Sequence, residues 1–270
     1  MSEATRATLP STWPRGLRRS FMLFSTFRQE VADPDRFYSV LATDTAVQIS
    51  RFARIPDAVI VDVGGGAGYF SQKFTELGAH CLLVEPEAVP LLDEPMPNFE
   101  TELERHDWLC RPGRLMPGRT IAGDGMRLPL PDNFADISFS SNVLEHVPSP
   151  EALIRESWRI TKPGGTIYIS YTLWWSLWGG HETSPWHFLG GHYAARRFEK
   201  KHGRPPANKF GTSLFGYRIA PMMKIIRELP GAQIHAEPRY YPKWLRWLVF
   251  IPAIREATVW NLLVVITKPA

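Results

Sequence analysis

The period of the hydrophobic pattern changes repeatedly along the chain. Short runs of consecutive apolar, often β-branched residues predict buried strands, while apolar residues three or four positions apart predict helices. The predicted strands are Ala58–Val63, His80–Glu85, Arg119–Ala122, a segment that starts near Phe134 and ends at Ser141, Thr166–Thr172, Ala232–Glu237 and Thr258–Thr267. Helices are predicted between them, at about Tyr69–Leu77, Phe99–His106, Ala194–His202 and Ala220–Leu229. This alternation is typical of an α/β fold.

The first 55 residues follow another pattern, with a basic start and two helical segments at about Leu17–Glu30 and Pro34–Phe52. Asp33 is a plausible N-cap, because Pro34 then occupies the first helical position. We expect residues 1–55 to form a helical cap that either covers a ligand or packs on the sheet edge. Residues 56–270 are then one α/β domain, with an insertion at about 173–217.

A glycine-rich turn follows the first predicted strand, where Asp62 precedes Gly64, Gly65, Gly66 and Gly68. Glycine suits a strand-to-helix turn at which a ligand approaches the backbone and the N–H groups of the helix start. A dinucleotide-binding turn would place its third glycine at position 69, where this chain has a tyrosine. The spacing therefore disfavours a nicotinamide cofactor, although a purely structural turn remains an alternative.

Acidic residues at the ends of two later strands indicate a nucleoside ligand. Glu85 ends the second predicted strand, where a carboxylate can accept hydrogen bonds from both ribose hydroxyls. Asp124 follows the third strand and is placed to accept a hydrogen bond from an adenine amino group, with Met126 against the ring. A solvated loop aspartate is the alternative for Asp124.

Ordered motifs further along resemble a known family. They are Asp124-Gly125-Met126-Arg127-Leu128-Pro129, Phe134-Ala135-Asp136, Leu144-Glu145-His146-Val147, the helix from Arg155 and the turn Lys162-Pro163-Gly164-Gly165. Together with the glycine turn they resemble the ubiquinone/menaquinone-type (type-11) domain of class I S-adenosylmethionine (SAM)-dependent methyltransferases over about residues 57–172. Phe134-Ala135-Asp136 is one residue longer than the family pattern.

The resemblance implies a Rossmann-like, seven-stranded sheet of order 3-2-1-4-5-7-6 with strand seven antiparallel. It implies SAM as cofactor and S-adenosylhomocysteine as product. The cofactor-binding residues would be Asp62, Gly64, Gly65, Gly66, Gly68, Glu85, Asp124, Gly125, Met126, Ser140 and Ser141.

The insertion is rich in tryptophan and histidine and leaves the sheet where the methyl group must point. We expect it to wall an apolar or aromatic acceptor pocket, and the substrate-lining candidates are Asn142, Trp174, Trp178, Trp186, His187 and Tyr193. Simple packing of the insertion onto the sheet is the alternative.

Four histidines are candidates for a general base: His146, His181, His187 and His192. His146 occupies a position that is often histidine in the family, which also fits a structural role. His181, Glu182, His187 and His192 match no metal-ligand spacing, so no metal site is expected.

Composition and charge limit the kinds of binding partner that we expect. The 270 residues carry a formal net charge of only +4 and no basic stripe with interleaved aromatics, so nucleic-acid binding is not expected. Trp244 and Trp247 lie beside Lys243 and Arg246 and could rest on a membrane surface, or pack on the sheet. The sequence does not predict the oligomeric state.

Two cysteines, Cys81 and Cys110, make no disulfide framework, which favours a reducing compartment. Arg18-Arg19 resembles a twin-arginine export signal, but Phe21–Phe27 lacks the apolar continuity and cleavage site of one. Trp244–Ile254 is the nearest approach to a membrane span and is interrupted by Arg246 and Pro252. We therefore expect a cytoplasmic protein, with possible contact to the inner membrane face.

The sequence thus predicts a SAM-dependent methyltransferase that acts on a small or lipid-like, apolar or aromatic acceptor, with O- or C-methylation favoured. A protein that binds SAM or S-adenosylhomocysteine without turnover is the main alternative. A nicotinamide-dependent oxidoreductase is a weaker one.

Overall fold

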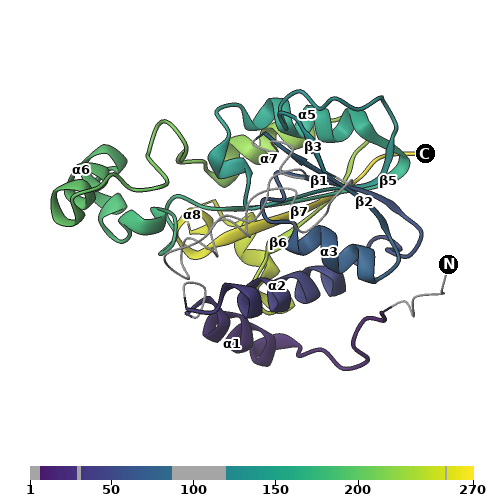
Figure 1. Ribbon diagram of the computed structural model, residues 1–270, viewed down its shortest axis with the longest axis horizontal. Helices are drawn as coiled ribbons and strands as arrows, with labels where there is room; N and C mark the ends of the chain where they lie inside the picture. Colours follow the sequence, from purple (N-terminus) through teal and green to yellow (C-terminus); the bar gives the residue numbers. More distant parts are fainter. Residues whose placement is uncertain (1–6, 29–31, 87–119, 253) are drawn as a thin grey trace, which may run out of the picture.

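A seven-stranded sheet of order β3-β2-β1-β4-β5-β7-β6 forms the centre of the computed structural model, which describes residues 7–28, 32–86, 120–252 and 254–270 (Figure 1). Its strands are β1 (Val59–Val63), β2 (His80–Glu85), β3 (Thr120–Ala122), β4 (Ala135–Ser141), β5 (Thr161–Thr172), β6 (Gln233–Pro238) and β7 (Asn261–Thr267). β7 is antiparallel to both of its neighbours, whereas the pairs from β3 to β5 are parallel. The predicted order and the antiparallel last strand are confirmed.

Helices cover both faces of the sheet (Figure 1). They are α1 (Gly16–Phe27), α2 (Pro34–Ile49), α3 (Tyr69–Glu76), α5 (Pro150–Ile160), α6 (Gly191–His202), α7 (Ile219–Arg227) and α8 (Arg255–Thr258), with short 3-10 helices η2 (Leu144–His146), η3 (His181–Thr183), η4 (Trp186–Leu189) and η5 (Lys243–Phe250). One core packs α5 and α7 against the sheet through residues such as Leu153 and Met222. A second core packs α1, α2 and α3 on the other face, through residues such as Phe37 and Phe74.

The two N-terminal helices are fastened to the sheet by buried polar groups. The Asp33 carboxylate caps α2 by accepting from the Arg36 N–H at 3.1 Å, as predicted. Arg239, at the end of β6, is fully buried and donates to Thr45 Oγ1 of α2 at 2.9 Å and to Ser141 Oγ of β4 at 2.8 Å. Arg19 of α1 in turn donates to the Arg239 carbonyl oxygen at 2.8 Å. These bonds hold the helical segment over the end of β4.

Two strand starts differ from their predicted positions. β5 begins at Thr161 rather than Thr166, because Thr161 pairs with Ala135 across a register shift. The shift places Asp136 at the strand edge, where it accepts from the Val59 N–H at 2.8 Å. β7 begins at Asn261 rather than Thr258, since α8 occupies the preceding residues. The helix expected near residues 99–106, the strand start at residue 119 and Cys110 lie outside the described residues.

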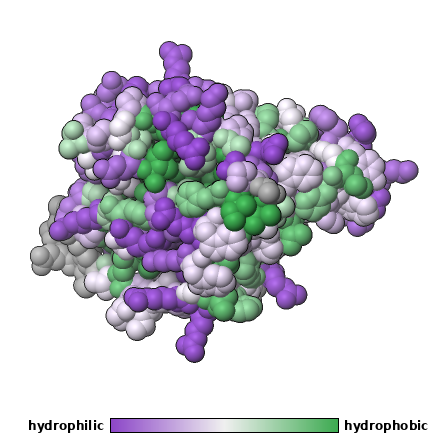
Figure 2. Space-filling model, turned by 180° about the vertical axis from the view of Figure 1, so that it is seen from behind, coloured by the Kyte–Doolittle hydropathy of each residue, from purple (hydrophilic) through white to green (hydrophobic). Residues whose placement is uncertain are grey.

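The insertion after β5 forms a lobe that projects from the body and carries α6 at its end (Figure 1). The same lobe stands out on the right of the opposite view (Figure 2). α6 starts three residues before the predicted Ala194. None of the helices in the described part of the chain has the length and apolar character needed to cross a bilayer.

Candidate functional site

The glycine loop between β1 and α3 needs glycine for two separate reasons. A Cβ on Gly65 would lie 2.3 Å from a Leu83 methyl group and 2.5 Å from the Asp62 carboxyl group, so this position has no room for a side chain. Gly66 instead has a positive φ of 53° and nothing within 4 Å of an added Cβ. Its bare backbone therefore faces open space, as a loop that receives a ligand should.

Asp62 lies beneath this loop and is completely buried. Ser71 Oγ donates to its Oδ2 at 2.6 Å, while Oδ1 has no partner among the described residues. Burial raises the pKa of Asp62 to about 7, and the nearby Glu85 charge adds to this, against the Ser71 hydrogen bond. The free carboxyl oxygen leaves an acceptor available for a hydrogen-bond donor on a ligand.

Glu85 connects the second strand to the glycine loop. Its Oε2 accepts from the Gly66 N–H at 3.0 Å, across the carboxyl ends of β2 and β1. This is the sheet edge at which open α/β sheets bind nucleosides. The position fits the ribose-binding role predicted for Glu85.

The remaining cofactor candidates occupy different surroundings. Asp124 Oδ1 accepts from the Met126 N–H at 2.8 Å, so its carboxylate closes a local turn after β3. A Cβ on Gly125 would lie 2.8 Å from a Val63 methyl group, so this glycine permits close packing. Ser140 is buried and donates to the Val63 carbonyl oxygen at 3.1 Å, whereas Ser141 lines the cavity described next.

A cavity of about 770 Å³ opens between the glycine loop and the N-terminal helices. The loop side is formed by Asp62, Gly64, Gly65, Gly66 and Ala67, and Gly68 caps α3 beside it with φ 81°. The opposite side is formed by Phe24 and Phe27 of α1 and by Phe37, Tyr38 and Leu41 of α2. Helices α1 and α2 therefore supply one wall of the site.

Five aromatic side chains in this cavity form a continuous set of ring contacts, which we call the aromatic wall: Phe24, Phe27, Trp178, Tyr240 and Trp260. Ring centroids are 5.1 Å apart for Phe24 and Trp260, 5.2 Å for Trp178 and Trp260, 6.1 Å for Phe27 and Trp178, and 4.9 Å for Phe27 and Tyr240. These rings come from α1, the insertion and the segments before β7. The site is therefore assembled from distant parts of the chain.

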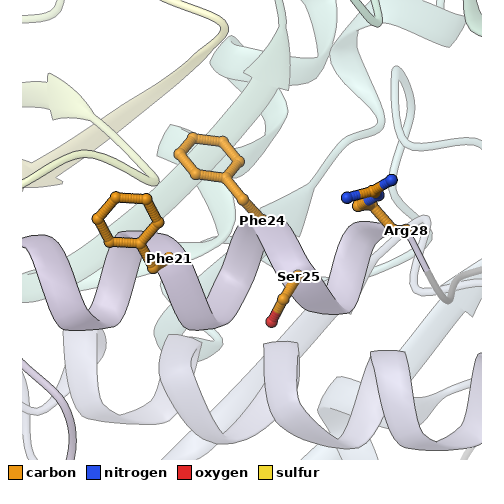
Figure 3. A pocket seen from close by; sticks show the side chains of 4 residues that line it. All are labelled: Phe21, Phe24, Ser25 and Arg28. Atoms are coloured by element: carbon orange, nitrogen blue, oxygen red, sulfur yellow. The ribbon is translucent and has the colours of Figure 1, made fainter.

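Phe24 also borders a smaller recess on the outer side of α1, with Phe21, Ser25 and Arg28. The Phe21 and Phe24 rings project from the same side of the helix, while the Ser25 hydroxyl points away from them (Figure 3). Phe24 is thus the residue that this recess shares with the cavity.

The insertion contributes fewer cavity residues than predicted. Of the substrate and base candidates, Asn142, His146, Trp178 and His181 line the cavity. The other candidates, Trp174, Trp186, His187, His192 and Tyr193, are not among its lining residues.

Four of these side chains make contacts within the lobe itself. His187 is fully buried and donates from Nε2 to the Ser176 carbonyl oxygen at 3.0 Å. The Trp174 ring packs 4.6 Å from that of Phe210, and His192 packs on the same phenylalanine. Trp186 lies under the Arg197 guanidinium at 3.8 Å. The contacts of these four side chains therefore stabilise the lobe, which corrects the expectation that they face an acceptor, whereas Tyr193 is 41% exposed.

The sequence prediction missed two groups of cavity residues. The first is the aromatic set on α1 and α2, although Phe24 and Phe27 are spaced three positions apart on one helical face. The second is Glu145, which is 1% exposed, with Asn261 at the start of β7. Asn261 Nδ2 donates to Asn142 Oδ1 at 2.8 Å and so fixes the Asn142 side chain.

Two of the lining histidines have defined surroundings. His146 Nδ1 lies 2.7 Å from the Ser213 carbonyl oxygen. Because a carbonyl only accepts, Nδ1 carries the proton and Nε2 keeps a lone pair when the ring is neutral. Burial and the neighbouring His146 lower the pKa of His181 to about 4, so its ring is neutral at pH 7. Burial likewise raises the pKa of Glu145.

The sequence model of a protein family, described as a methyltransferase domain, matches residues 61–169 of this chain. An uncharacterized methyltransferase of Mycobacteroides abscessus is 40% identical over 256 residues, which cover 93% of this chain and 94% of that one. One from Mycobacterium tuberculosis is 40% identical over 257 residues, with 93% and 95% covered.

Solved structures share the fold. A SAM-dependent methyltransferase from Mesorhizobium loti superposes with a TM-score of 0.52 at 18% identity, covering 83% of this chain and 96% of that one. One from Archaeoglobus fulgidus gives 0.50 at 15% identity, covering 90% and 99%.

The sheet order and the glycine loop at its switch point define the class I SAM-dependent methyltransferases. Because its mycobacterial relatives match almost end to end, the chain belongs to this methyltransferase family. Its cofactor is SAM and its product S-adenosylhomocysteine.

The loop residues fit this cofactor. Gly66 offers an open backbone and Asp62 an unpaired buried oxygen, while Glu85 lies at the end of β2. Bound SAM supplies a methyl group on a sulfonium, so it carries its own electrophile. The protein's task is to position the acceptor and to exclude competing water.

Proposed function

We propose that the chain methylates an oxygen or carbon atom of a small, apolar or aromatic acceptor, lipid-like in character, that binds against the aromatic wall. The observation that carries the proposal is the arrangement of this wall opposite the glycine loop within one cavity. Flat apolar side chains bury large areas and favour a hydrophobic ligand, whereas a few polar groups fix its orientation.

Polar groups of suitable kind lie on the same cavity surface. His146, His181 and Asn142 all line it and could orient a hydroxyl or acid group of the acceptor. A nucleic-acid or protein acceptor would need an open, charged groove instead. The proposal therefore favours a small molecule over a macromolecule.

Exposed apolar side chains support delivery of a lipid-like acceptor from a membrane surface. Phe21 on α1 is 71% exposed and Trp244 on η5 is 65% exposed, beside Lys243 and Arg246. Such side chains insert into the interface of a bilayer while basic residues contact anionic headgroups. Hydrophobic patches lie among hydrophilic residues on the face shown in Figure 2.

A methyl-labelling experiment tests the acceptor. The purified protein is incubated with labelled SAM and a cell extract, and the labelled product is separated and identified. We expect label in a small organic-soluble molecule. Label confined to protein or nucleic acid would contradict the proposal, and no label at all would favour a SAM-binding protein without turnover.

Vesicle sedimentation tests the membrane surface. We expect binding to vesicles of phosphatidylglycerol, weakened by replacing Trp244 and Trp247 with serine. Leu189→Ser is the matched control, because Leu189 is 66% exposed but lies on the insertion lobe. Equal binding of both variants would remove η5 from the contact.

A further inference from the structure

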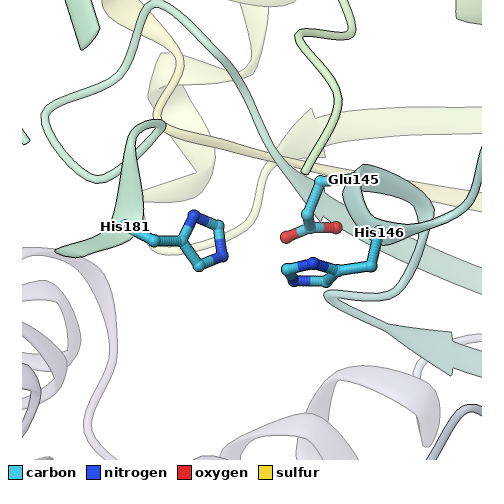
Figure 4. Close-up of side chains that lie close together, drawn as sticks. All are labelled: Glu145, His146 and His181. Carbon is cyan, nitrogen blue, oxygen red and sulfur yellow. The ribbon is translucent and has the colours of Figure 1, made fainter. Parts of the chain in front are cut away.

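Three side chains that can donate lone pairs meet on one wall of the cavity. Glu145 and His146 belong to η2, and His181 begins η3 in the insertion. One ligand atom from each lies within 4.8 Å of the other two. Figure 4 shows the three side chains pointing towards one another, with His181 approaching from the opposite side.

Glu145 and His146 are each held in place by a hydrogen bond to one polar side-chain atom, which leaves the other polar atom for a ligand. His146 donates from Nδ1 to the Ser213 carbonyl oxygen, which leaves Nε2 as the ring nitrogen with a lone pair. Glu145 Oε1 accepts from the Thr172 N–H at 3.0 Å. Metal-binding histidines and carboxylates are oriented by outer hydrogen bonds of this kind.

The second carboxylate oxygen of Glu145 makes no hydrogen bond among the described residues. Oε2 is buried and has no hydrogen-bond partner within the described ranges of the chain. The Glu145 side chain is 1% exposed, so water does not compensate readily. A buried acceptor without a donor is costly, and a cation at this point would offset the cost.

The backbone at His181 supports a specific role for its ring. Its φ is 48°, in the left-handed region that non-glycine residues rarely occupy. Such conformations persist where surrounding structure imposes them, and they concentrate at ligand sites. Here the conformation accompanies a ring that faces Glu145 and His146 across 5.0 Å between the histidine centroids.

We propose that Glu145, His146 and His181 bind one divalent transition-metal ion, of the Zn²⁺, Mn²⁺ or Co²⁺ kind, in the acceptor half of the cavity. Two imidazole nitrogens and one carboxylate oxygen are ligands that these ions favour. Because the protein supplies only three ligands, further coordination positions stay open for the substrate. The metal-ligand set considered from sequence was His181, Glu182, His187 and His192, which shares only His181 with this one, because only the fold brings η2 and η3 together.

The ion would bind an oxygen of the acceptor and lower the pKa of a hydroxyl, whose proton passes to solvent water. This step rests on the proposed function and narrows it, since a hydroxyl-bearing or acidic acceptor is then favoured. It would place the acceptor oxygen on the same cavity surface as Asn142.

Metal binding is tested apart from catalysis. Chelator-treated protein is titrated with Co²⁺ and with Zn²⁺, by visible absorption for cobalt and by calorimetry for both. We expect one ion per chain and cobalt bands that report nitrogen and oxygen ligands. Glu145→Gln and His181→Asn should each weaken binding by at least about tenfold. His202→Ala, on exposed α6, should bind as the wild type does.

The outcomes separate the metal site from the proposed function. Wild-type protein that binds no ion, or variants that bind it unchanged, would overturn the metal site, whatever the methyl-transfer result. Thermal melting identifies a variant that fails to fold, and the remaining variant then decides. Ion binding with no transfer to any apolar acceptor would instead retain the site and reject the proposed acceptor.

Discussion

His146 donates a hydrogen bond from Nδ1 to the carbonyl oxygen of Ser213, a residue 67 positions away. The Phe215 N–H also donates to the Glu145 carbonyl oxygen at 2.7 Å. The returning arm of the insertion is therefore attached to the residues that follow β4. This attachment fixes the tautomer and orientation of a histidine that lines the cavity.

Glu85→Ala is expected to weaken SAM binding by about 1–3 kcal/mol, because a hydrogen-bonding carboxylate at the predicted ribose position is lost. Calorimetric titration with SAM measures the change. Glu76→Ala on α3 is the control, since Glu76 pairs with Lys73 on the same helix. Unchanged affinity for the Glu85 variant would exclude the predicted ribose contact.

Gly66→Ala separates ligand access from backbone strain. Gly66 and Gly203 both have positive φ and open space around an added Cβ, but Gly203 ends α6 on the lobe. Each alanine variant should lose about 1 kcal/mol of folding stability. Only Gly66→Ala should also lose SAM affinity, and equal SAM affinity in the two variants would argue against close approach at Gly66.

Trp178→Ala and Trp186→Ala form a matched pair, with wild-type exposures of 42% and 41%. Trp178 belongs to the aromatic wall and Trp186 does not. The first variant should lower kcat/KM for the acceptor by the equivalent of about 1–3 kcal/mol and leave SAM affinity nearly intact. The second should change little, and steady-state kinetics with the identified acceptor compares them.

Asp62→Asn is expected to stabilise the ligand-free protein at alkaline pH. Folding raises the pKa of Asp62 from 3.8 to about 7, so the folded state holds a proton that the unfolded state releases. The contribution of Asp62 to the free energy of unfolding is complete below pH 3.8 and is lost as the pH rises to about 7. Melting temperatures should therefore favour the variant at pH 8 and differ little at acid pH, while SAM binding weakens.

Glu237→Gln should destabilise the protein in a pH-dependent manner. Burial alone would raise the pKa of Glu237, but hydrogen bonds from His235 and Arg51 outweigh it and lower the pKa to about 2. Its contribution is present above the usual value of 4.5 and disappears as pH falls to about 2. We expect a loss of about 1–3 kcal/mol in urea unfolding at pH 7.

The same measurement near pH 3 should give a much smaller difference between variant and wild type. Glu228→Gln serves as the control, because Glu228 is half exposed and meets Arg155 only at 3.6 Å. A constant difference across the pH range would show that shape, and not charge, explains the effect of Glu237.

Sequence patterns predicted the sheet and the glycine loop well, for local reasons. β1 is a short apolar run, and positions such as Gly65 tolerate no side chain, so each position carries its own signal. The part of the cavity that the insertion lines depends on tertiary packing instead. His187 was predicted from sequence to line the acceptor pocket, yet its ring contacts the Ser176 carbonyl and the Trp174 ring.

Glu145 shows the same limit from the other direction. In sequence it is one acidic residue beside a histidine, and nothing local distinguishes it from a surface glutamate. Its burial and its meeting with His181 arise only when the insertion folds back over η2. Contacts of this range are not encoded in short motifs.

The bonds around Arg239 also constrain the order in which the chain can fold during synthesis. Arg19 donates to the carbonyl oxygens of Arg239 and Tyr241, and Gln48 donates to that of Arg239. These partners emerge from the ribosome long after α1 and α2. The first two helices can therefore complete these contacts only after nearly the whole sheet has been synthesised, and until then the Phe24 ring lacks its partner Trp260.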